Sequence, residues 1–158
     1  MKELFPVICL VILAALPTAT AKAVDGPFTV TILYDNTASA PGTEADWGFA
    51  CLVEGLEKTI LFDTGTKPEV FLHNVEALGV DLADVDLVVI SHEHGDHTGS
   101  LTRVLEQTHG LPVYHPVSFS DEFVRSVARA GSTSVPVTGP VEIIPNVFLT
   151  GEMGTAIK

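Results

Sequence analysis

The chain has 158 residues, of which 46% are hydrophobic, and a formal net charge of −12. This length is sufficient for one domain with a sizeable hydrophobic core. The acidic balance and the lack of any block of Lys and Arg residues argue against a phosphate-contacting surface, so we expect no nucleic-acid binding.

Residues 1–23 have the order of a secretory signal peptide. A positive start at Lys2 is followed by an apolar run over residues 5–16, and small residues at 19, 21 and 23 offer cleavage sites. The run is short for a membrane span. We therefore expect cleavage, export to the periplasm or the extracellular space, and no stable membrane anchor afterwards. The alternatives are an uncleaved anchor and a wrongly assigned start codon.

Cys51 would be the only cysteine of the mature chain, because Cys9 lies within the apolar run. An intramolecular disulfide is then excluded. The neighbours of Cys51 are apolar, which favours a small buried core residue over a nucleophile.

Residues 24–158 are predicted to form one α/β domain. The patterns predict, in chain order, a strand at 28–34, a hairpin of strands at 47–53 and 59–62, a helix from a capping box at 66–69 to Gly79, a strand at 86–90, a helix at 100–109, a short strand at 112–114, a helix at 121–130 and a strand at 141–149. Strands that lead into helices and return to strands indicate the α/β class, here with a strand hairpin at the front.

Four potential metal ligands lie within six residues, directly after the strand at 86–90: His92, His94, Asp96 and His97. If the backbone leaves this strand in an extended form, residues 92, 94 and 96 lie on one side. Gly95 would then let the chain turn so that residues 96 and 97 face a second metal. Imidazole and carboxylate groups suit zinc, iron or manganese better than calcium. A two-metal site of this kind would hold a bridging hydroxide as nucleophile. The alternative is a His-rich polar surface loop.

This motif, together with the segment 60–65 that ends in Asp63-Thr64-Gly65, resembles the metallo-β-lactamase-fold superfamily. The resemblance runs from about residue 28 to residue 152. Shorter matches at 34–36, 47–48, 71–74, 91–99 and 114–116 resemble the branch named for dihydropterin–ribofuranosylaminobenzene-phosphate synthase, a methanopterin-pathway transferase. The implied fold is the N-terminal half of an αββα sandwich.

The resemblance also implies roles for the motif residues. His92 and His94 would bind a first metal, while Asp96, the expected catalytic residue, and His97 would bind a second. His94 stands where the iron-binding oxidoreductases of the superfamily have Glu, which favours zinc and hydrolytic or transfer chemistry. We expect two zinc ions, with iron or manganese as alternatives. Asp63 would be a second-shell carboxylate that orients a ligand; otherwise it caps the turn after its own strand.

The family pattern needs a third His, a bridging Asp and a last His from later loops. Here no histidine follows His115 and no aspartate follows Asp121. We therefore expect a C-terminally truncated domain, in which an apolar sheet face centred on residues 86–90 is uncovered; a naturally short protein is the alternative. His115 follows the motif too closely to be the third ligand, and it either lines a substrate pocket or has a structural role beside Pro116.

These features together predict an exported metal-dependent hydrolase-like enzyme that acts on a small molecule when full length and is inactive as this fragment. One alternative is a transferase resembling the methanopterin-pathway synthase. The export signal argues against it, because the pterin substrates of that enzyme are made in the cytoplasm. The other alternative is a non-catalytic metal-binding module with a degenerate site.

Overall fold

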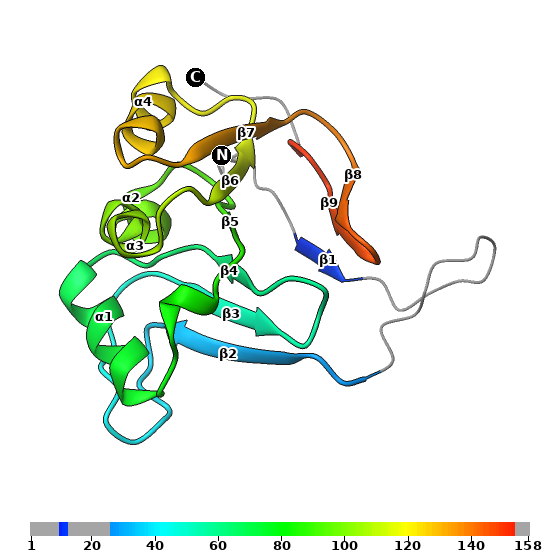
Figure 1. Ribbon diagram of the computed structural model, residues 1–158. Coiled ribbons are helices and arrows are strands. Elements are labelled where there is room, and N and C mark those ends of the chain that lie inside the picture. Colours follow the sequence, from blue (N-terminus) through cyan, green and yellow to red (C-terminus); the bar gives the residue numbers. More distant parts are fainter. Residues whose placement is uncertain (1–9, 13–25, 154–158) are drawn as a thin grey trace, which may run out of the picture.

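A computed structural model describes residues 10–12 and 26–153 (Figure 1). The predicted signal peptide therefore lies outside the described residues, apart from a short strand, β1 (Leu10–Ile12), that pairs antiparallel with β9 (Val147–Leu149). Cleavage after residue 23 would remove this strand. Within the described part of the chain, no helix combines the length and the apolar character needed to cross a membrane.

A six-stranded mixed sheet forms the centre of the fold. Its strands follow one another in chain order: β2 (Thr29–Tyr34), β3 (Ala50–Glu54), β4 (Ile60–Phe62), β5 (Leu87–Val89), β6 (Pro112–Pro116) and β7 (Thr133–Val137). The first three strands pair antiparallel, and the strands from β4 to β7 pair parallel. The carboxyl ends of the parallel strands therefore share one edge, where ligand sites of such sheets usually form.

Helices cover one face of this sheet, and a small second sheet covers part of the other (Figure 1). The helices are α1 (Pro68–Ala77), α2 (Gly95–Thr98), α3 (Leu101–Thr108) and α4 (Asp121–Arg129), with a 3-10 turn at Leu82–Asp84. The second sheet contains β1, β9 and β8 (Val141–Ile144). One apolar core fills the space under the helices, and another lies between the two sheets. This α/β arrangement agrees with the predicted class.

The predicted order of strands and helices is confirmed, with four local differences. The structure adds β7 and α2, which the sequence patterns did not predict. The segment 141–149 forms a hairpin instead of one strand, because Asn146 adopts a positive φ of 66° between β8 and β9. The predicted capping box is wrong: Lys67 is the N-cap of α1 and makes no side-chain cap bond. The Thr66 hydroxyl instead donates to the backbone oxygen of Trp47.

The expected uncovered face is at a different place in the sheet. Leu87 and Val89 of β5 are fully buried, because the β8–β9 hairpin packs over them. The exposed apolar side chains of this face belong to the edge strand β2 and its approach, where Phe28, Val30 and Ile32 are about half exposed. Their β3 partners, Val53 and Cys51, are core residues of the same face. Burial raises the pKa of the Cys51 thiol to about 12, in agreement with the predicted core role.

Candidate metal centre

The candidate site lies where two loops meet at the carboxyl ends of β4 and β5. The turn 63–65 follows β4, and the segment 91–98 follows β5 and ends in the short helix α2. Backbone and side chain of Thr64 tie the loops together, since its N–H and its hydroxyl donate to the His97 carbonyl oxygen at 2.8 and 3.0 Å. The positions of the motif residues are thus fixed relative to the sheet.

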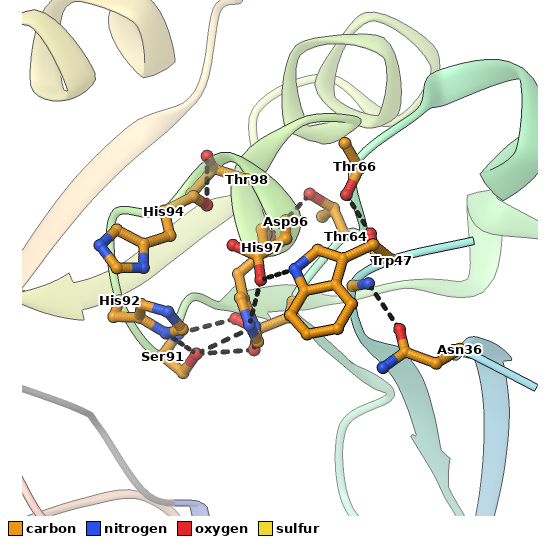
Figure 2. A network of polar contacts seen from close by, with 12 residues as sticks. Asn36, Trp47, Thr64, Thr66, Ser91, His92, His94, Asp96, His97 and Thr98 are labelled. Atoms are coloured by element: carbon orange, nitrogen blue, oxygen red, sulfur yellow. Dashed lines mark hydrogen bonds and ion pairs between the residues drawn. The ribbon is translucent and has the colours of Figure 1, made fainter. Parts of the chain in front are cut away.

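Three of the four predicted ligands converge. His92, Asp96 and His97 each offer one ligand atom, and these atoms lie within 4.8 Å of one another. The ring centroids of His92 and His97 are 4.1 Å apart, and His97 Nε2 lies 3.6 Å from Asp96 Oδ2. His94 is outside this group of three, although its ring packs edge-on against the His92 ring at 4.8 Å (Figure 2).

The local backbone explains this grouping. The extended conformation expected for residues 92–96 ends at His94, because α2 begins at Gly95. The helical turn brings Asp96 and His97 back toward His92, so the expectation that 92, 94 and 96 share one side of an extended chain is wrong. The sequence motif did not reveal this turn, because four residues are too few for a helical periodicity.

Buried Asp63 forms hydrogen bonds with the segment 91–98. Its side chain is 1% exposed, and its Oδ1 accepts a hydrogen bond of 2.7 Å from the backbone N–H of Ser91. Its Oδ2 accepts from the Ser91 hydroxyl at 2.7 Å and lies 2.7 Å from His97 Nδ1. The Ser91 oxygen also lies 3.0 Å from His92 Nδ1 (Figure 2).

These contacts fix the tautomers of both histidines. A carboxylate only accepts, so His97 Nδ1 carries the proton and donates to Asp63. The Ser91 hydroxyl donates to Asp63, so toward His92 Nδ1 it acts as the acceptor. In both rings Nε2 is then the nitrogen with a lone pair for a metal. Ser91 was not among the predicted site residues, although it directly precedes His92 and lies within the 91–99 match.

The two histidines differ in their electrostatics. Burial lowers the pKa of His97, but the hydrogen bond and the charge of Asp63 outweigh burial and raise this pKa above its usual value. Burial and the neighbouring His97 lower the pKa of His92, which favours its neutral, metal-binding form. Two imidazole nitrogens and a carboxylate oxygen are a donor set that suits zinc.

His115 lies in the core, away from an accessible surface. It is 1% exposed and packs against Phe119 and Phe123, with ring centroids 5.0 and 5.1 Å away. Its Nδ1 lies 2.7 Å from the Pro116 carbonyl oxygen and its Nε2 lies 2.6 Å from Ser134 Oγ. Both ring nitrogens are therefore engaged within the protein, as in the structural role considered beside Pro116.

Comparison with known proteins gives a consistent family match. Residues 48–153 match the metallo-beta-lactamase superfamily. The 7,8-dihydropterin-6-methyl-4-(beta-D-ribofuranosyl)-aminobenzene-5'-phosphate synthase of Methanocaldococcus jannaschii is 30% identical over 128 residues, which are 67% of this chain and 44% of that protein. The anaerobic nitric oxide reductase flavorubredoxin of Aliivibrio fischeri is 37% identical over 70 residues, which are 43% of this chain and 14% of that protein.

Among solved structures, a metal-dependent hydrolase of the beta-lactamase superfamily superposes with a TM-score of 0.59 at 31% sequence identity. The match covers 77% of this chain and 47% of that one. The chain thus spans less than half the length of each of these relatives.

Proposed function

The chain belongs to the metallo-beta-lactamase superfamily, and we propose that it contributes to a metal-dependent hydrolase that acts on a small molecule. The observation that carries this proposal is the convergence of His92, Asp96 and His97 at the carboxyl end of β5. A solved relative that is described as a metal-dependent hydrolase supports the reaction class.

The motif residues and Asp63 would have different roles in this site. His92 and His94 would hold one zinc ion, and Asp96 and His97 would hold a second one beside it. In His92 and His97 the metal-binding atom would be Nε2. Zinc bound there would lower the pKa of a water molecule and so supply a hydroxide nucleophile at neutral pH. Asp63 would support the site without touching the metal, because it accepts the hydrogen bond from His97 Nδ1, which orients that ring and increases its basicity.

A transferase is the second candidate, because the synthase of Methanocaldococcus jannaschii is 30% identical to this chain. The two candidates differ in the acceptor: water for a hydrolase, and a second substrate for a transferase. Turnover of a test ester, phosphodiester or thioester with water alone, by a protein that carries the whole domain, would favour hydrolysis. Turnover that requires an added acceptor would favour transfer.

Metal analysis tests the proposal. We expect a protein that carries the whole domain to contain about two zinc ions, and we expect His94→Ala to abolish activity while most of the fold is kept. His73→Ala is the matched control, because His73 is a half-exposed histidine that contacts the Gly42 carbonyl oxygen outside the site. A protein of this kind without metal by elemental analysis would refute the proposed function.

We propose export for the same protein, on the basis of residues 1–23. Expressed in a bacterium, the mature protein should begin near Lys22 or Val24 and should be recovered outside the cytoplasm. N-terminal sequencing of the purified product decides this. A soluble cytoplasmic product that still begins with Met1 would contradict it.

A further inference from the structure

Asp96 is held by the segment 47–49, which is distant in sequence from the His-rich motif at 92–97. The indole Nε1–H of Trp47 donates to Asp96 Oδ2 at 2.9 Å (Figure 2). Two residues later, the backbone N–H of Phe49 donates to the Asp96 carbonyl oxygen at 3.2 Å. The segment 47–49 therefore contacts both the side chain and the backbone of this candidate ligand.

The close approach requires glycine at position 48. Gly48 has a φ of 140°, and a Cβ atom placed there would lie 2.4 Å from the Asp96 carbonyl oxygen. A side chain would thus push the segment away from α2. The Gly48 N–H donates to Asn36 Oδ1 at 3.1 Å, and the Thr66 hydroxyl donates to the Trp47 carbonyl oxygen. The backbone of the segment is therefore fixed on both sides of the indole.

Core packing does not explain this arrangement, because Trp47 is 69% exposed. A large aromatic residue that stays in solvent contributes little apolar burial to stability. The position of Trp47 instead fixes the direction of the hydrogen bond from its indole N–H to Asp96. The indole N–H is a donor only, so it can hold a carboxylate without competing for a metal.

We propose that Trp47 is a positioning residue for the metal centre, which holds the Asp96 carboxylate beside His97 Nε2 through its indole N–H. The inference rests on the proposed function, since it concerns the same metal site. Outer contacts of this type change metal affinity by about 10–100-fold when they are lost. Removal of the N–H should therefore weaken metal binding without affecting the core.

The zinc affinity of the whole chain tests this role, measured by competition with a chromophoric chelator. Trp47→Phe keeps an aromatic ring but removes the N–H, and it should weaken zinc binding by about 10–100-fold with an unchanged thermal melt. Phe28→Leu is the matched control, because it removes an exposed aromatic ring outside the site and should leave zinc affinity unchanged. Equal zinc affinity of Trp47→Phe and the wild type would overturn the proposal.

A second measurement needs no metal. Trp47 is the only tryptophan of the chain, so its indole N–H gives a single proton signal in an NMR spectrum. In Asp96→Ala this signal should move upfield and exchange faster with solvent, and an unchanged signal would overturn the proposed contact. A wild-type chain that binds no zinc would instead contradict the proposed function, while the indole signal would still decide whether Trp47 holds Asp96.

Discussion

The carboxylate of Asp63 joins His97 across 34 residues of chain, with Oδ2 lying 2.7 Å from the ring Nδ1. Asp63 reaches this position because the turn after β4 places it under the loop after β5, with a positive φ of 56°. Its other contact is to Ser91, which in turn contacts His92. One buried carboxylate therefore orients two candidate ligands at once.

Asp63→Asn tests this relationship. The amide keeps one acceptor oxygen and replaces the other with an N–H₂ group, so it cannot accept all three bonds from Ser91 and His97, and the negative charge beside His97 is lost. We expect zinc affinity to fall by about 10–100-fold. Asp63→Ala should in addition lower the free energy of unfolding by about 1–3 kcal/mol, because the buried Ser91 N–H loses its acceptor.

Asp86→Asn provides the control for this pair. Asp86 is also a hydrogen-bonded carboxylate, which accepts from Lys58 and Thr59 at the opposite end of β5. Its substitution should leave zinc affinity unchanged. Wild-type zinc affinity in Asp63→Asn would show that Asp63 serves the fold alone.

The buried His115 makes stability depend on pH. Burial lowers the pKa of His115 below 6.5, and the contacts of the ring require a neutral imidazole that donates from Nδ1 to Pro116 and accepts at Nε2 from Ser134. Just below pH 6.5, His115 therefore binds a proton more readily in the unfolded chain than in the folded chain. The contribution of this group is complete above pH 6.5 and is lost as pH falls toward the lower folded pKa.

Urea unfolding at several pH values measures this loss. Relative to His115→Gln, the wild type should lose up to about 1.4 kcal/mol more of its free energy of unfolding for each pH unit below pH 6.5. NMR titration of the His115 ring gives the direct check. A ring that titrates at or above pH 6.5 would contradict the account.

Glu93, the residue between His92 and His94, connects the motif to α4. Its Oε2 accepts a 2.6 Å hydrogen bond from the Ser120 N–H, and its Oε1 accepts from the Ser120 hydroxyl. Ser120 is the N-cap of α4, and its oxygen accepts from the Phe123 N–H at 3.1 Å. Hydrogen bonds of Ser120 thus connect the segment 91–98 with the start of α4.

Ser120→Ala should lower the free energy of unfolding by about 0.5–2 kcal/mol, because the helix loses its cap and Glu93 loses a donor. Ser120→Thr keeps the hydroxyl and should recover most of this stability. Chemical denaturation of both variants makes the comparison. An equal loss in the threonine variant would mean that the cap is not the cause.

The apolar stripe on β2 is expected to control solubility. Val30 and Ile32 of the edge strand β2, and Phe28 just before it, have half-exposed apolar side chains, and other chains can add to such an edge. Val30→Lys should reduce self-association, as measured by light scattering, and leave the melting temperature nearly unchanged. Val89→Lys should instead unfold the protein, because Val89 is fully buried under the β8–β9 hairpin. If Val30→Lys leaves self-association unchanged, a surface other than the β2 edge is responsible for it.

Much of the fold follows from local sequence patterns. Buried strands such as 86–90 and amphipathic helices such as 121–130 leave a periodic signal that is independent of the rest of the chain. The segment that became β7 has no comparable signal, because it begins with two adjacent polar residues, Thr133 and Ser134, and contains Pro136. It is a strand because it pairs in parallel with β6, a segment about 20 residues earlier in the chain.

In the site, too, local features could be predicted from the sequence and long-range contacts could not. The ligand types at 92–97 could be predicted, because the His and Asp residues that supply them lie close together in the sequence. The grouping of His92 with Asp96 and His97 depends on where α2 begins, and the contact with Trp47 joins residues 49 positions apart. Long-range contacts of this kind are determined by packing and leave no local pattern.

The most direct test of the metal centre is a calorimetric zinc titration of residues 24–158, with His97→Ala and His73→Ala beside the wild type. We expect the wild type to bind zinc more weakly than a closed tetrahedral site does. We expect equal binding by His73→Ala and loss of binding by His97→Ala. Zinc binding by His97→Ala with wild-type affinity, or no binding by any of the three proteins, would contradict the proposed metal centre.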